Sequence, residues 1–86
     1  MTPAELAARL RAGEAFENAN LEGIDLSGEN LIGANLGKAN LRGAKLAGAK
    51  LLRARLEGAD LSATDLNGAS FVRANLRGAK LNGADM

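Results

Sequence analysis

The side chains that could carry out chemistry in this chain are few, and their usual catalytic partners are missing. The sequence contains no cysteine and no histidine. Thiolate and imidazole metal sites, cysteine or serine–histidine nucleophiles and disulfide bonds are therefore excluded. The remaining candidates are scattered carboxylates and the hydroxyl groups of Ser27, Ser62, Thr64 and Ser70. We expect no enzymatic activity, no cofactor and no metal site.

An apolar residue recurs at every fifth position from Phe16 to Met86, and this repeat must position all other side chains. The residue two places earlier is alanine at 11 of 15 positions, and the residue two places later is usually glycine. In an α-helix, five residues advance about 500°, so the apolar residues would cover every face. In a flat strand, an odd spacing would send every second one into solvent. All of them can point inward only if the chain turns a corner in each repeat.

The repeating unit has the pattern A-[N/D/K]-L-x-G, which resembles that of the pentapeptide-repeat proteins. Clear copies are Ala34-Asn35-Leu36, Ala59-Asp60-Leu61-Ser62 and Ala74-Asn75-Leu76-Arg77-Gly78. The resemblance implies an all-β solenoid, a right-handed, four-sided parallel β-helix with four pentapeptides per coil. Residues 14–86 would then form just under four coils, with the central leucine filling the interior and the alanine packing beside it.

The first thirteen residues have a different pattern, that of a short helix. Residues 2–5, Thr-Pro-Ala-Glu, form a capping box with proline at the first helical position. Leu6 and Leu10 share one helical face, and Gly13 is a natural stop. We expect residues 1–13 to be a capping unit, with an α-helix that covers the open N-terminal end of the β-helix.

If one coil takes twenty residues, outward residues that are twenty positions apart stack in a column along the solenoid. One of these columns is apolar. The equivalent columns on the other three faces are polar or small. Arginines stand beside this column where glycine is usual, and a lysine lies across from it. The candidate interaction surface consists of Ile32, Leu52, Val72, Arg53, Arg73 and Lys50. The alternative is that these aliphatic residues only reinforce the pairing of parallel strands.

The formal net charge is only +1, but the charges fall into blocks. Residues 37–55, most of the expected second coil, carry six basic groups and no acidic one. The twenty-residue period places opposite charges on adjacent coils, which favours structural charge ladders over a binding surface. The expected pairs are Glu22 with Arg42, Asp25 with Lys45, Lys45 with Asp65, Glu57 with Arg77, and Asp60 with Lys80.

Glu29 occupies an inward position at which alanine is the rule. A carboxylate there is a candidate for a perturbed pKa. We expect instead a structural role at the junction of helix and first coil, with hydrogen bonds from the backbone or an ion pair with Arg9 or Arg11.

The C-terminal end of the sequence has no second capping helix, which leaves Leu76, Leu81 and Met86 as a candidate end-to-end contact. A rod with one capped and one bare end would pair its bare ends in a closed two-fold homodimer. The apolar column offers a rival two-fold contact. Alternatively, the chain is a module of a longer protein.

These observations favour a non-catalytic scaffold or protein–protein interaction module, in the setting of a bacterial, cytoplasmic protein. We find no signal peptide and no membrane-spanning segment, and we expect a protein partner rather than nucleic acid or a membrane. Two alternatives remain. Some members of the family that the chain resembles mimic DNA and bind gyrase or other type II topoisomerases, but basic residues interrupt the negative face that this requires. The other alternative is binding of anionic partners through the basic second coil.

Overall fold

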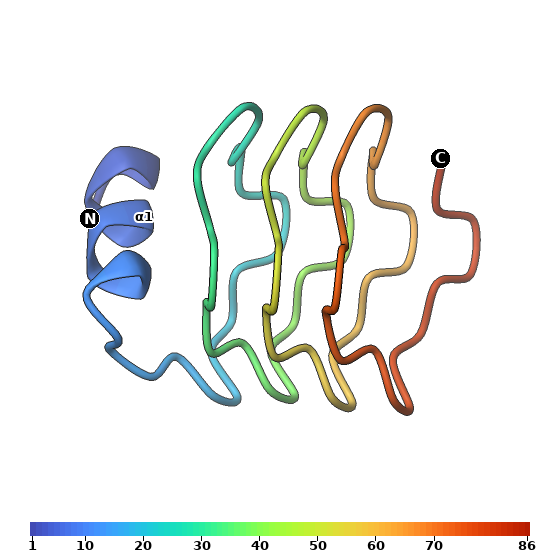
Figure 1. Ribbon diagram of the computed structural model, residues 1–86. Helices are drawn as coiled ribbons and strands as arrows, with labels where there is room; N and C mark the ends of the chain where they lie inside the picture. Colours follow the sequence, from blue (N-terminus) through green and yellow to red (C-terminus); the bar gives the residue numbers. More distant parts are fainter.

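The computed structural model describes all 86 residues, which form one helix followed by a solenoid (Figure 1). Single bridge residues recur at every fifth position from Ala15 to Asp85. Each bridge is parallel and joins residues twenty positions apart, from Ala15 with Asn35 to Asp65 with Asp85. Twenty residues, or four pentapeptides, therefore complete one turn. Each side of a turn contributes one bridge residue rather than an extended strand, because a corner follows within a few residues.

Each corner lies two residues after a central residue and has left-handed backbone geometry. The φ angles at these corners lie between 57° and 73°. Glycine adopts such angles without the steric cost that a Cβ atom brings, which explains why it recurs there, as predicted. Five corners nevertheless carry other residues, namely Asn18, Lys38, Arg53, Ala63 and Arg73.

The central leucines and the alanines two places before them fill the interior. From Leu26 to Leu61 every central leucine is at most 1% exposed. The assignment of these two registers to the inside is therefore confirmed. Thr64 replaces alanine without leaving a polar group unpaired, because its hydroxyl donates a hydrogen bond to the carbonyl of Leu61 at 2.7 Å.

The Asn or Asp before a central residue stabilises the corner that follows it through a side-chain hydrogen bond. In seven repeats its side-chain oxygen accepts a hydrogen bond from the backbone N–H two residues later, at 3.0 to 3.3 Å. Asn and Asp favour turns through this contact, which explains their place in the repeat. The residues that accept it are Asn20, Asp25, Asn30, Asn40, Asp60, Asp65 and Asn75.

Helix α1 (Pro3–Arg11) begins with the predicted capping box. The N–H of Thr2 donates to the Glu5 carboxylate at 2.9 Å, and the N–H of Glu5 donates to the Thr2 hydroxyl at 3.1 Å. Hydrogen bonds to the Glu5 carboxylate from the Thr2 backbone and, next, from the Thr2 side chain lower the pKa of Glu5. With nine residues, α1 is too short to cross a membrane, and the structure has no other helix.

The inner face of α1 closes the N-terminal end of the solenoid (Figure 1). Leu6, Ala7 and Leu10 are at most 1% exposed and belong to the same core as the central leucines. The Arg11 guanidinium donates to the backbone carbonyl of Asn30 at 3.0 Å, which satisfies one acceptor at the edge of the first coil. The helix thus covers both apolar side chains and a polar group at this end.

Candidate protein-interaction groove

Five of the six residues of the predicted interaction surface line one shallow groove on the side of the solenoid. The groove has a volume of about 480 Å³. Its lining consists of Ile32, Leu52, Arg53, Val72 and Arg73. Lys50 lies outside this lining, and its bridges to Asn30 and Ser70 place it on the same face. We keep the name groove for the five lining residues below.

The apolar column of the groove takes one residue from each of three neighbouring coils, and backbone hydrogen bonds join these coils. The N–H of Gly33 donates to the Leu52 carbonyl at 2.8 Å, and the N–H of Arg53 donates to the Val72 carbonyl at 2.9 Å. Ile32 is 44% exposed and Val72 is 57% exposed, while Leu52 between them is half-buried. Apart from the two methionines at the chain ends, Ile32 and Val72 are the exposed large apolar residues of the molecule.

The two arginines of the groove occupy corners with φ angles of 57° and 60°. A residue with a Cβ atom pays about 1–2 kcal/mol for this conformation, which glycine at most other corners avoids. Unfavourable backbone geometry of this kind is common at functional sites. Both side chains are exposed and form no ion pair, since the ion pairs of the structure are Arg9–Glu14 and Arg42–Asp60.

The axial ion pairs predicted between stacked residues do not form. The backbone positions are stacked as expected at Asp25 and Lys45, at Lys45 and Asp65, and at Asp60 and Lys80. The one ion pair between coils is Arg42–Asp60 at 3.4 Å, which joins residues eighteen apart. The carboxylates at the bridge positions are already held by the N–H groups of their own corners, so they do not turn towards the stacked lysine.

The same corner contacts lower the pKa values of Asp25 and Asp65. Hydrogen bonds from the side chain and backbone of Ser27 lower the pKa of Asp25, and the charge of Lys45 lowers it further. Asn67 acts in the same way on the pKa of Asp65, again with a contribution from Lys45. Lys45 therefore acts through space on both neighbours without an ion-pair contact.

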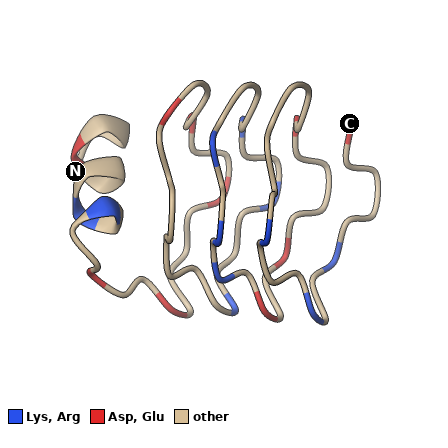
Figure 2. Cartoon of the chain, viewed as in Figure 1, with Lys and Arg blue, Asp and Glu red and all other residues tan.

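The six basic residues of the second coil do not form one basic face. They occupy different positions within a twenty-residue turn, so they point to different sides of the solenoid, and Figure 2 shows Lys and Arg spread around the coils. Arg53 lines the groove, and Lys50 stacks with Asn30 and Ser70, whereas Arg55 stacks with Asn35 and Asn75 on the next side and Lys38, Arg42 and Lys45 belong to other sides. This arrangement gives neither a continuous negative face for DNA mimicry nor a continuous basic one for anions.

Glu29 does not make the contacts predicted for it. Its side chain is half-buried but has no hydrogen bond or ion pair. Arg9 instead pairs with Glu14 at 3.7 Å, and Arg11 donates to the carbonyl of Asn30. Both guanidinium groups thus have partners other than the Glu29 carboxylate.

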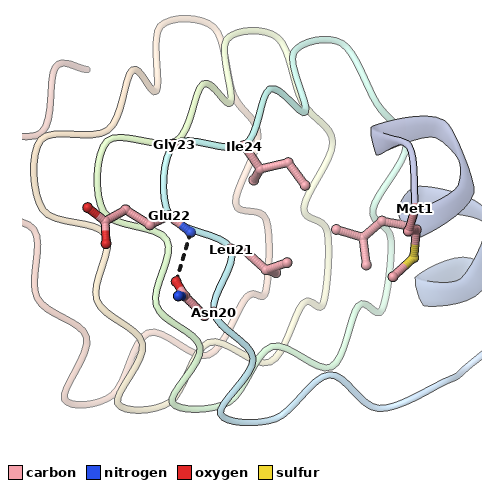
Figure 3. Close-up of a pocket in the computed structure, with 7 residues that line it drawn as sticks. Met1, Asn20, Leu21, Glu22, Gly23 and Ile24 are labelled. Carbon is pink, nitrogen blue, oxygen red and sulfur yellow. Dashed lines mark hydrogen bonds between the residues drawn. The ribbon is translucent and has the colours of Figure 1, made fainter.

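A second hollow, which the sequence did not predict, lies between α1 and the first coil and measures about 360 Å³ (Figure 3). In this view Leu21 and Ile24 point towards Met1, while the Glu22 side chain points away. The Asn20 side-chain oxygen is occupied by the N–H of Glu22 at 3.3 Å. The hollow is therefore lined mainly by apolar groups, and it depends on how the helix sits, which no residue pattern reveals.

The predicted end-to-end contact lies on the last turn. Leu76 and Leu81 are half-buried, and Met86 is 75% exposed. The backbone N–H groups of Leu76 and Leu81 have no hydrogen-bond partner, because no further coil follows them in the structure. A dimer through this end stays a prediction.

The repeat and the solenoid define the class of protein. The family model "Pentapeptide repeats (8 copies)" matches residues 15–48, 30–62 and 54–86. The chain belongs to the pentapeptide-repeat family, whose members are generally non-catalytic. No curated protein sequence matches the chain significantly.

Solved structures of pentapeptide-repeat proteins are similar to this one, and they indicate a right-handed β-helix solenoid. A protein from the thylakoid lumen of Arabidopsis thaliana is 36% identical, with a TM-score of 0.82 over 93% of this chain and 59% of its own. Rfr23 from the cyanobacterium Cyanothece 51142 is 34% identical, with a TM-score of 0.63 over 80% of this chain and 54% of its own. HetL from the cyanobacterium Nostoc is 33% identical, with a TM-score of 0.51 over 81% of this chain and 39% of its own. The chain thus spans less than two thirds of each of these relatives.

Proposed function

We propose that the chain is a non-catalytic pentapeptide-repeat module of just under four coils that binds a protein partner through the groove. The observation that carries this proposal is the exposure of Ile32 and Val72 on one column of an otherwise polar surface. Exposed apolar side chains that lie together and are bordered by charged residues are typical of interaction sites.

Strand pairing alone does not account for this column. The equivalent columns carry Glu, Gly, Ser, Ala, Asn and Arg, and their backbones form the same ladder hydrogen bonds. For example, the N–H of Gly43 donates to the Ser62 carbonyl at 2.9 Å, and the N–H of Gly48 donates to the Asn67 carbonyl at 2.8 Å. The ladder therefore does not need aliphatic residues at this position, which leaves contact with a partner as the reason for them.

A role of this kind fits the description of one structural relative. HetL is described as involved in the regulation of heterocyst differentiation. Regulation through a rigid, non-catalytic rod requires a surface that recognises another protein, and the groove supplies one in this chain.

The test is a comparison of two outward columns. A photo-crosslinking amino acid replaces Leu52 in one variant and Ala47, the equivalent residue of another face, in a second. We expect a partner to be crosslinked from position 52 and not from position 47. A triple variant with Ile32→Ser, Leu52→Ser and Val72→Ser should lose this partner in a pull-down, whereas Ala47→Ser should retain it. Equal capture by all variants would contradict the proposal.

A further inference from the structure

The edge of the solenoid that carries the groove has positive charge and no counter-charge. The guanidinium groups of Arg53 and Arg73 have no ion pair or hydrogen bond, and Lys50 and Arg55 have none either. No acidic residue occupies an outward position of this edge. Neighbouring coils are about 4.8 Å apart, so the two arginines repel each other, and an anion beside them removes that repulsion.

We infer that the groove binds an acidic amphipathic α-helix of a partner protein, which lies along the axis of the solenoid. This inference rests on the proposed function and specifies the chemistry of the partner. Aliphatic side chains of the partner helix pack on Ile32, Leu52 and Val72. Its Asp or Glu side chains pair with Arg53 and Arg73, in the planar geometry that guanidinium and carboxylate groups share.

The spacing of the column favours a helix over an extended segment. The column presents one aliphatic residue per coil, about every 4.8 Å. A helix presents one side chain per turn on a given face, about every 5.4 Å, so the two series stay nearly in register over three coils. Side chains on one face of a strand are about 6.8 Å apart, which misses the coils by about 2 Å at each step. The carbonyls of Leu52 and Val72 also already accept ladder hydrogen bonds from the N–H groups of Gly33 and Arg53, so an added strand would find no free carbonyl at these two residues.

Charge argues against a second copy of the chain as the occupant. A two-fold axis perpendicular to the solenoid axis, within the contact plane, places Arg53 and Arg73 opposite the same arginines of the other copy. A two-fold axis parallel to the solenoid axis places them opposite the side of the column that carries Lys50. Both arrangements set cations against each other in a partly dehydrated contact, which is unfavourable.

Nucleic acid fits the groove less well than an acidic helix. Phosphate groups would satisfy the arginines but would leave the aliphatic column without an apolar partner. The chain has no tryptophan or tyrosine, and its two phenylalanines are central residues of the solenoid, so no exposed ring is available for base stacking.

The test uses a synthetic peptide of about fifteen residues, held helical by a side-chain staple, with leucines three and four positions apart and glutamates beside them. Binding is measured by fluorescence anisotropy on the full chain. Three comparison ligands are the same peptide with lysine for glutamate, an acidic peptide with alternating leucine and glutamate that includes proline, and a DNA duplex. We expect the acidic helix to bind at least about tenfold more tightly than each of these, with an affinity that falls as salt is raised.

Two protein variants separate the groove from the fold. The double variant Arg53→Gly/Arg73→Gly removes both charges and introduces the residue that these corners favour, so its melting temperature should not fall. It should bind the acidic helix at least about tenfold more weakly. The matched control is Lys38→Gly, which removes a basic residue from a corner with the same φ of 57° on another face. This control should bind like the unmodified chain.

Three results overturn the inference: tighter binding of the extended peptide or DNA, no binding of any peptide at about 1 mM, or equal weakening by Lys38→Gly and the double variant. The proposed function is tested separately. A partner that is captured through position 52 but binds equally well to the double variant, or that contacts the groove without a helix, overturns only the acidic-helix inference. A partner whose capture does not depend on the apolar column overturns both.

Discussion

Leu51 and Leu52 are adjacent residues of the same type, but their surroundings differ. Leu51 is 1% exposed and belongs to the core, whereas Leu52 is half-buried and lines the groove. The inward registers repeat almost the same residues in every turn because the interior has the same shape throughout. The outward columns are free to vary, and one of them differs from the other three. In this molecule the interior explains the fold, and the difference among the outward columns is the basis of the proposed function.

Truncating the two leucines should give the largest contrast. Leu51→Ala should lower the free energy of unfolding by about 2–5 kcal/mol, because the filled interior cannot collapse around the gap. Leu52→Ala should cost about 1 kcal/mol or less, because the side chain is only partly buried. Urea unfolding followed by circular dichroism measures both. Equal losses in the two variants would show that the division between inside and outside is wrong.

Exchanging corner residues for glycine should have a smaller effect of opposite sign. Arg53→Gly and Ala63→Gly both relieve left-handed backbone strain, and each should raise the free energy of unfolding by up to about 1 kcal/mol. Only Arg53→Gly should weaken binding at the groove, because Ala63 lies on another face. If Arg53→Gly instead destabilises the chain, the arginine has a structural role that the contacts do not reveal.

Lowering the pH should destabilise the solenoid through the aspartates at its corners. Hydrogen bonds from the side chain and backbone of Ser62 hold the pKa of Asp60 below its ordinary value of 3.8, and Arg42 lowers it further. A pKa lowered by folding contributes stability above the unfolded value, and this contribution is lost as the pH falls through the folded one. Melting temperatures should therefore be steady down to about pH 4 and then decrease. Asp60→Asn should flatten this decrease, because Asn40 makes the same corner contact in the previous coil.

The predicted contact through the last turn can be distinguished from the rival dimer contact through the groove by adding a charge at each, with little change in the free energy of unfolding. Met86→Lys should dissociate a dimer formed through the last turn, and Leu52→Lys should leave it intact. Sedimentation velocity at high micromolar concentration distinguishes the two variants. A monomer in the unmodified chain would exclude both the end contact and a contact through the groove.

The interior and the corners could be predicted from the sequence because each is a local consequence of the five-residue repeat. The groove could be predicted as well, since the twenty-residue coil alone brings Ile32, Leu52 and Val72 together. The charge ladders are present only through space, without the predicted ion-pair contacts, because stacked positions do not by themselves bring the charged groups into contact. Asp25 and Asp65 stack on Lys45 of the coil between them, but each accepts a hydrogen bond at its own corner. The hollow beside α1 and the isolation of Glu29 depend on how the helix sits, which no periodicity specifies.

The parallel bridges between residues twenty apart have a consequence for how such a chain can change in length. The interior repeats every five residues, but the surface columns repeat every twenty. Inserting one pentapeptide after residue 60 would leave the core chemistry unchanged and rotate everything downstream by a quarter turn. Val72 would then leave the column of Ile32 and Leu52, and a different set of side chains would become neighbours. Inserting four pentapeptides would lengthen the rod and keep every column aligned. Single-repeat insertions can therefore create a new surface in one step while the stability of the rod is largely retained.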